Sequence, residues 1–226
     1  MKNTFMVIDT ETTTHDHMAY DVGFVICDKH GKIVEHYQSL VEEVITSPEN
    51  MRAAFYHRKV FERYIPMLSS GETTVRKWSD IFDRMKEAIE QHKVTVIAAY
   101  NLAFDARVMG LMQERFGDGS RMLQEHHKTL CLWNLACMTR LNTARFRNTA
   151  DNFGWKSEKG NYKTSAEIAY RYMMHSPDFV EDHTALADCI VEVAVMAECL
   201  ASKKAIPYDD KAIAQPWRLV QRSATE

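Results

Sequence analysis

Apolar residues fall into short runs separated by polar turns in the first part of the chain. Residues 5–8 form an apolar run that ends in acidic residues, and residues 19–28 and 32–40 have the composition of two strands around a turn at residues 29–31. This order predicts one strand followed by a β-hairpin. Residues 41–77 have an irregular pattern interrupted by proline and glycine, which predicts helical turns and loops over the core.

The pattern changes to helical periodicity after residue 77. Ser79 is a candidate N-cap for a helix whose apolar positions up to Ile89 recur at helical spacing. Residues 94–100 then form an apolar run typical of a buried strand. Asn101 is a candidate N-cap for a second helix. This alternation of strands and helices favours an α/β fold.

The C-terminal half predicts one more strand and several helices. We expect a strand at residues 129–133, followed by helical stretches at residues 135–140, 145–153 and 165–173. A final helix over residues 184–201 is apolar almost all round, which predicts that it is buried. The chain then turns polar after residue 203, where we expect it to wrap the surface or fray.

Length and composition suit one compact domain. The chain has 226 residues, of which 46% are hydrophobic and 26% charged, enough to bury a core. We expect this domain to occupy residues 1–202 and a C-terminal tail to occupy residues 203–226. The formal net charge of −3 does not attract a polyanion to the surface as a whole. A nucleic-acid footprint would therefore have to be local.

Cysteine usage and hydropathy bear on the compartment. The five cysteines are an odd number, include no C-x-x-C pair and lie among apolar neighbours, as buried free thiols do. This pattern favours a reducing cytoplasm. Residues 1–8 lack a basic flank ahead of a long apolar stretch, and no run of roughly eighteen apolar residues occurs. We expect neither secretion nor membrane insertion.

Two acidic residues close the first predicted strand. Asp9 and Glu11 stand two positions apart, so the period of a strand places both side chains on one face. Adjacent carboxylates repel each other unless a cation joins them. The pair therefore suggests a metal site, although a plain polar loop after a strand has the same composition.

A third acid follows the next buried strand. Asp105 falls in the first turn of the helix that begins after Asn101, where a carboxylate also suits the helix dipole. In an open α/β sheet, sites form beyond the carboxyl ends of the strands. Asp9, Glu11 and Asp105 would all gather at that edge.

The final helix carries a fourth acid among apolar neighbours. Asp188 would be costly to bury without a cation, an arginine or exposure. His183 precedes it by five positions, which is about 140° on an ideal helix, so the two could not share a helical face. We therefore place His183 at the helix entrance, where Asp182 or Glu181 could cap the helix.

Three segments then stand in a fixed order: Asp9-Thr10-Glu11-Thr12-Thr13, Tyr100-Asn101-Leu102-Ala103-Phe104-Asp105, and His183-Thr184-Ala185-Leu186-Ala187-Asp188. They resemble the three motifs of the DEDDh (DnaQ-like) 3′→5′ exonucleases, which include the proofreading epsilon subunit of bacterial replicative polymerases and ribonuclease T. The resemblance covers roughly residues 5–200. Thr14 replaces a glycine that often follows the first motif, and Tyr100 replaces a histidine that often begins the second. Neither position is a metal ligand.

The resemblance implies a ribonuclease-H-like fold, with a mixed central β-sheet flanked by α-helices, and two bound Mg²⁺ or Mn²⁺ ions. Asp9 would bridge the ions, Glu11 and Asp188 would hold the ion on the nucleophile side, and Asp105 would hold the other. His183 would be the general base. Oxygen ligands suit these ions, and two such ions lie roughly 3.5 to 4 Å apart in two-metal sites.

The resemblance also implies a substrate and its contacts. The substrate would be nucleic acid with a free 3′ end, with single-stranded DNA favoured and RNA possible, and a polymerase or replication protein could be a partner. The residues assigned to substrate binding are Thr10, Thr12, Tyr56, His57, Asn101 and Phe104. Tyr56 and His57 match the family segment only loosely. A basic stretch near the third motif could grip phosphates or form a solvated face: Arg140, Arg145, Arg147, Lys156, Lys159 and Lys163.

Three other interpretations stay open. The enzyme could trim RNA or degrade oligoribonucleotides instead of DNA. The chain could be a ribonuclease-H-like binding module attached to a polymerase, although four clustered carboxylates would then serve no purpose. It could also be a zinc hydrolase built on His15 and His17 or on His126 and His127, although loop histidines at such spacing are more often solvated.

Overall fold

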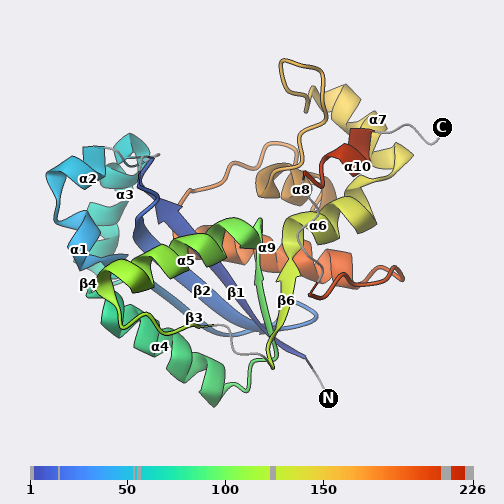
Figure 1. The fold of residues 1–226 in the computed structure, drawn as a ribbon. Coiled ribbons are helices and arrows are strands. Elements are labelled where there is room, and N and C mark those ends of the chain that lie inside the picture. The colour runs from blue at the N-terminus through green and yellow to red at the C-terminus, as the bar shows by residue number, and fades with distance from the viewer. Residues whose placement is uncertain are drawn as a thin grey trace.

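A computed structural model describes residues 3–14, 16–52, 54, 57–122, 126–209 and 215–221, with backbone alone for residues 57–61. Six strands of the described chain form one sheet in the order β4-β3-β2-β1-β5-β6 (Figure 1). Their bounds are β1 Thr4–Thr12, β2 Ala19–Asp28, β3 Ile33–Val41, β4 Thr74–Arg76, β5 Val96–Ala99 and β6 Lys128–Cys131. Among them β2 is antiparallel to both neighbours, and the other pairs are parallel.

Helices cover both faces of this sheet (Figure 1). One face packs against α1 Glu42–Ile45, α2 Pro48–Arg52, α3 His57–Ser70, α4 Trp78–Gln91 and α5 Leu102–Phe116. The other packs against α6 Leu132–Ala136, the π-helix η1 Cys137–Leu141, α7 Ala144–Phe153, α8 Ala166–Met173, α9 Ala185–Leu200 and α10 Arg218–Gln221. The predicted α/β fold, a mixed sheet flanked by helices, is confirmed.

Alternation along β1 decides where its acidic residues point. Met6 and Ile8 pack in the core with α4 and α5, whereas Phe5 and Val7 pack in the core with α9. Because side chains alternate between the faces of a strand, the odd-numbered residues at the end of β1 continue on the α9 side. The register between β1 and β2 stays regular up to Glu11, so this alternation reaches the first motif.

The structure corrects several predicted elements. Helix α4 begins at Trp78 with Lys77 as its N-cap residue, so Ser79 is not the cap. Glu43 of α1 provides the side-chain cap of α4, because it accepts a hydrogen bond from the Trp78 backbone N–H at 3.0 Å. The strand predicted at residues 94–100 is shorter, and the helix predicted at residues 135–140 is divided between α6 and η1. The predicted hairpin is confirmed as β2 and β3.

The start of α9 lies directly on β2. A Cβ added to Gly23 would come within 2.6 Å of the Ala185 carbonyl carbon, so only glycine permits this approach. Beside it, the buried Asp21 carboxylate accepts a hydrogen bond from the Ala185 backbone N–H at 2.9 Å. Neither Glu181 nor Asp182 is the N-cap; that position belongs to Thr184, whose side chain makes no capping bond. Strand β2 therefore positions the helix entrance.

The described parts of the C-terminal segment pack onto the rest of the chain. Asp209 accepts a hydrogen bond from the Thr129 backbone N–H at 2.7 Å, and Val220 on α10 is fully buried. Helix α10 packs against η1. Within the described ranges no helix has the length and apolar character needed to cross a membrane.

Candidate active site

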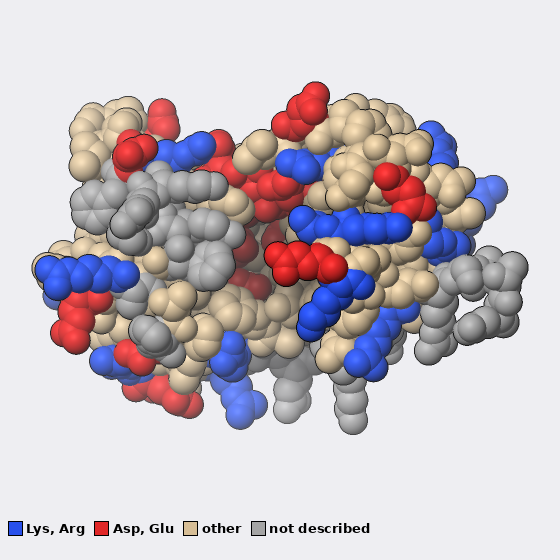
Figure 2. All heavy atoms as spheres, turned by 90° about the horizontal axis from the view of Figure 1, so that it is seen from above, with Lys and Arg blue, Asp and Glu red and all other residues tan. Residues whose placement is uncertain are grey.

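The three sequence motifs meet at one end of the sheet. Asp9 and Glu11 lie at the end of β1, and Asp105 and Asp188 lie in the first turns of α5 and α9. Because β1 and β5 are parallel neighbours, β1 ends beside the turn from β5 into α5. Seen from above, acidic side chains gather in a hollow near the centre, with Lys and Arg side chains to its right (Figure 2).

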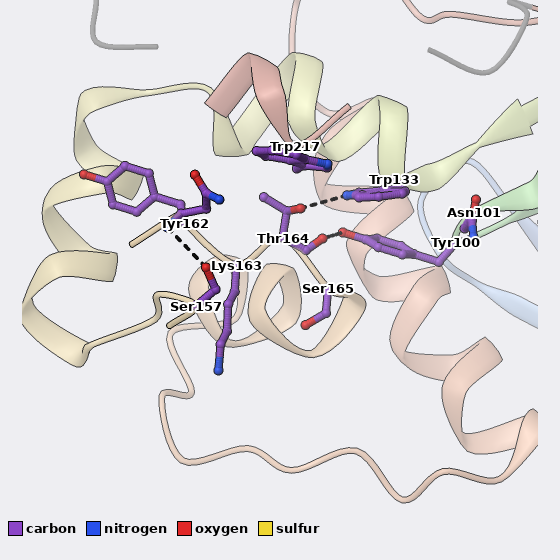
Figure 3. A pocket seen from close by; sticks show the side chains of 10 residues that line it. Tyr100, Asn101, Trp133, Ser157, Tyr162, Lys163, Thr164, Ser165 and Trp217 are labelled. Atoms are coloured by element: carbon purple, nitrogen blue, oxygen red, sulfur yellow. Dashed lines mark hydrogen bonds between the residues drawn. The ribbon is translucent and has the colours of Figure 1, made fainter. Parts of the chain in front are cut away.

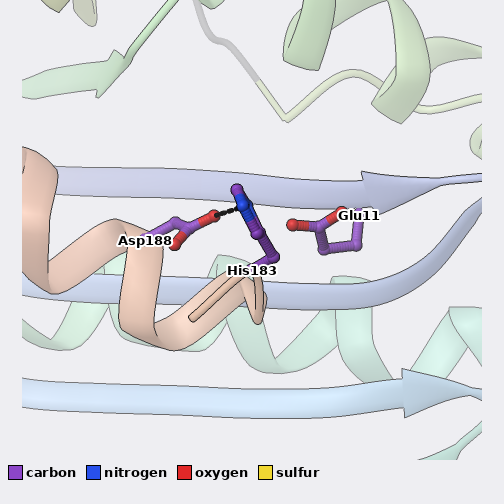
Figure 4. Close-up of side chains that lie close together, drawn as sticks. All are labelled: Glu11, His183 and Asp188. Atoms are coloured by element: carbon purple, nitrogen blue, oxygen red, sulfur yellow. Dashed lines mark ion pairs between the residues drawn. The ribbon is translucent and has the colours of Figure 1, made fainter. Parts of the chain in front are cut away.

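Glu11, His183 and Asp188 form a close group. One ligand atom from each lies within 4.8 Å of the others, and the His183 Nδ1 atom is 3.9 Å from Asp188 Oδ2. The imidazole lies between the two carboxylates (Figure 4). The Tyr20 hydroxyl faces Glu11 Oε2 at 3.5 Å. Three potential ligands from β1 and α9 are thus brought together.

His183 lies at the entrance of α9, two residues before the helix begins, as predicted. We expected its side chain to lie off the Asp188 face, because five helical residues span about 140°. The His183 backbone is instead left-handed, with φ of 54°, a conformation that is uncommon for a residue with a side chain. The imidazole lies close to Asp188.

Asp105 is held by the first motif. The Thr10 hydroxyl donates a hydrogen bond to Asp105 Oδ1 at 2.9 Å, and both residues are buried. This contact joins β1 to α5. Burial raises the pKa of Asp105 to about 7. The pKa of Asp9 is also raised, first by burial and then by the negative charges of Glu192 and Asp105.

Burial and repulsion between neighbouring carboxylates raise pKa values in this cluster, which makes it suited to divalent cations. Burial and the charge of Asp188 raise the pKa of Glu11 to about 9, and burial and the charge of Asp21 raise that of Asp188 to about 7. The buried Asp188 Oδ1 atom has no hydrogen-bond partner among the described residues. Carboxylate oxygens are the ligands that Mg²⁺ and Mn²⁺ prefer. Asp9, Glu11, Asp105 and Asp188 therefore fit such ions.

The sequence analysis missed acids that adjoin this cluster. Glu192, one turn beyond Asp188 on α9, is 2% exposed and accepts a hydrogen bond from the Tyr100 backbone N–H at 3.1 Å. Asp21 accepts bonds from Tyr64 and Gln38 as well as from α9. Both residues carry the signal that led to Asp188, because each is an acid surrounded by apolar sequence.

The other residues assigned to substrate have varied positions. Thr12 is buried at the end of β1. Asn101 is exposed at the N-cap of α5, with a left-handed backbone and no side-chain capping bond. Phe104 is half-buried in the first turn of α5. Tyr56 lies outside the described residues, as does the side chain of His57.

Some of the predicted basic stretch has structural partners. Arg140 donates to the Glu198 carbonyl oxygen at 2.8 Å, and Lys156 pairs with Asp151 at 2.5 Å. Lys163 is exposed and lines the hollow that contains His183. For the zinc alternative, His15 lies outside the described residues. Within the described ranges two groups of side chains could hold a metal, and both contain His183. One adds Glu11 and Asp188, and the other adds Glu167 and Glu181.

Comparisons with known proteins give a likeness to solved structures. No protein-family model and no curated protein sequence matches the chain. The chain is similar to a solved structure described as Exonuclease X in complex with 5′ overhanging duplex DNA, with a TM-score of 0.45 and 19% sequence identity. The match covers 86% of this chain and 90% of that one. Similarity at this level assigns neither an activity nor a substrate.

Proposed function

We propose that this chain is a metal-dependent 3′→5′ exonuclease that hydrolyses phosphodiester bonds from the 3′ end of DNA, with single strands favoured. One observation carries the proposal: Asp9, Glu11, Asp105, His183 and Asp188 come from three motifs far apart in sequence and meet at one end of the sheet. Their order and spacing resemble the DEDDh motifs. We assign the catalytic domain to residues 1–202.

The four carboxylates would hold two Mg²⁺ or Mn²⁺ ions. Such ions, when bound, orient the phosphodiester and stabilise charge on the attacking and leaving oxygens. Burial raises the pKa values of these four carboxyl groups. Bound cations would stabilise their ionised form, so the raised pKa values support a metal-binding role. Thr10 orients the Asp105 carboxylate through its hydroxyl.

His183 would act as the general base. Its ring lies between Glu11 and Asp188 (Figure 4), where a nearby carboxylate can stabilise the imidazolium that forms when the ring accepts a proton from the attacking water. The distance of 3.9 Å between His183 Nδ1 and Asp188 Oδ2 allows this electrostatic support. An apo arrangement of this kind commonly tightens when substrate binds.

The test is digestion of 3′- and 5′-labelled single-stranded DNA, duplex DNA and RNA with Mg²⁺, Mn²⁺ or EDTA. We expect mononucleotides to be released from 3′ ends, with loss of activity in EDTA and recovery when either ion is added back. Cleavage of a circular single strand, or trimming from 5′ ends only, would contradict the proposal. Preference for RNA over DNA would change the substrate and leave the catalytic assignment intact.

A further inference from the structure

A cavity of about 520 Å³ lies beside the candidate active site and is lined largely by aromatic rings. Four aromatic residues contribute: Tyr100, Trp133, Tyr162 and Trp217. Trp133 and Trp217 are each half-buried, whereas the Tyr162 ring points away from the other three rings (Figure 3) and packs against Phe146. The lining also contains Lys163 and short polar side chains (Figure 3). Aromatic rings next to a positive charge are the surface on which proteins stack the bases of single strands.

Hydrogen bonds fix two of these rings. The Trp133 Nε1–H group donates to Thr164 Oγ1 at 2.8 Å, and the Tyr100 hydroxyl donates to the Thr164 carbonyl oxygen at 2.6 Å (Figure 3). Gln221 on α10 accepts a bond from the Tyr162 backbone N–H at 2.7 Å and donates to its carbonyl oxygen at 3.1 Å. The wall is therefore preorganised, which lowers the entropy lost when a ligand binds.

The cavity adjoins the catalytic group from two directions. Tyr100 and Asn101 immediately precede α5, which carries Asp105. A second hollow, of about 700 Å³, contains His183 and shares Lys163 and Ser165 with the aromatic cavity. A strand that leaves His183 through the second hollow would pass Lys163 before it reached the aromatic rings.

We infer that the aromatic cavity is a subsite for a nucleobase of the substrate strand. Lys163 would contact a backbone phosphate between that nucleobase and the part of the strand held at His183. The inference rests on the proposed function. Because a 3′ exonuclease holds the terminal nucleotide at its metals, the base in this cavity belongs to a nucleotide on the 5′ side of the scissile bond. Trp217 is a substrate-binding residue supplied by the C-terminal segment.

Binding of fluorescently labelled oligothymidylate in EDTA tests this subsite without hydrolysis. Trp217→Ala should weaken binding about tenfold, within the range for loss of one stacked base, and Trp217→Phe should retain most of the affinity. Lys163→Glu should also weaken binding, because it removes the proposed phosphate contact. Lys163 is exposed, so its replacement does not disturb the fold. Tyr208→Ala is the matched control, because this half-buried ring also lies in the C-terminal segment but contacts Lys128, outside the cavity.

Hydrolysis assays distinguish failure of the subsite proposal from failure of the proposed function. With Mg²⁺, Trp217→Ala should raise KM for oligothymidylate more than it raises KM for a dinucleotide, because only the longer strand has nucleotides to place in both hollows. If the wild-type chain binds oligothymidylate but hydrolyses nothing, the proposed function fails and the subsite stands. If Trp217→Ala and Lys163→Glu both bind as tightly as Tyr208→Ala, or if a peptide but no oligonucleotide binds there, the subsite is overturned.

Discussion

The left-handed backbone of His183 makes glycine and alanine unequal replacements there. Either change should slow the chemical step by roughly 10²- to 10⁴-fold if the imidazole is the general base. With φ of 54°, alanine keeps the steric conflict and glycine removes it, so His183→Gly should be about 1 kcal/mol more stable than His183→Ala. Single-turnover rates and thermal melting measure both effects.

Two further measurements make this prediction specific. Added imidazole should partly restore the rate of His183→Gly, because the missing side chain leaves room for it. Metal affinity, measured by calorimetry, should stay close to that of the wild type in His183→Gly and be lost in Asp9→Ala. A His183→Gly enzyme with a near-normal rate would remove histidine from the mechanism.

The buried carboxyls predict how stability depends on pH without metal. Glu11, Asp105 and Asp188 have pKa values raised to about 9, 7 and 7, against about 4 in an unfolded chain. The folded chain therefore binds more protons between these limits, and the free energy of unfolding falls as pH rises through them. We expect the Tm of the metal-free protein to decrease from about pH 5 to about pH 9.

Adding Mg²⁺ should reverse this trend, because protons and metal compete for the same oxygens. The increase in Tm on adding Mg²⁺ should be larger at alkaline than at acidic pH. Glu11→Gln should flatten the dependence in the metal-free protein, because it removes the carboxyl with the highest pKa of the three. A wild-type Tm that stays constant over this range, or rises with pH, would contradict the burial of the cluster in protonated form.

Taken one at a time, site residues could be predicted from the sequence only where an acidic residue stood among apolar neighbours. Asp188 stands out because apolar residues surround it, and Glu192 has the same signal but was not identified. The approach of His183 to Asp188 was not predictable from spacing, because it depends on one left-handed residue. Asp21 also has this signal, but its role could not be predicted from the sequence, because it accepts long-range hydrogen bonds from α9 and Tyr64.

At the scale of elements, the contact of β2 with α9 is the most sensitive to substitution. Gly23→Ala should lower the free energy of unfolding by about 1–3 kcal/mol, because its Cβ would meet the α9 backbone. It should also weaken metal binding, because α9 carries Asp188. Gly110→Ala in α5 is the matched control, since nothing lies within 4 Å of its added Cβ. Chemical denaturation and calorimetry compare the two, and equal effects would contradict this account.

The accuracy of the predicted elements follows the strength of their periodicity. The hairpin and α9 were found because alternation and an apolar helix are local patterns. The start of α4 was misplaced because Glu43, from another element, caps it. The change from α6 to η1 was not predicted, because π-helical turns have no distinct apolar period and depend on packing.

The charge distribution of the whole molecule predicts how salt affects binding. The net charge is −3, and two residues of the predicted basic stretch, Arg140 and Lys156, already have protein partners. We expect single-stranded DNA to contact few phosphates, with a slope of log affinity against log salt of about −1.5 to −3. Lys163→Gln should reduce the slope by about 0.7. A slope several times steeper would indicate an extended basic surface instead.

The attachment of α9 to β2 has a consequence for how such a chain can diverge. Residues 142–182 enter from η1 and return just before His183. Within them α8 packs against α9, while Asp21 and Gly23 hold the helix entrance. The loops at residues 154–164 and 174–182 can therefore be lengthened, shortened or exchanged while the carboxylates keep their places. Substrate preference can then change during evolution while the chemistry is retained. A chimera that alters only these loops should change which strands are trimmed without changing the bond that is cut.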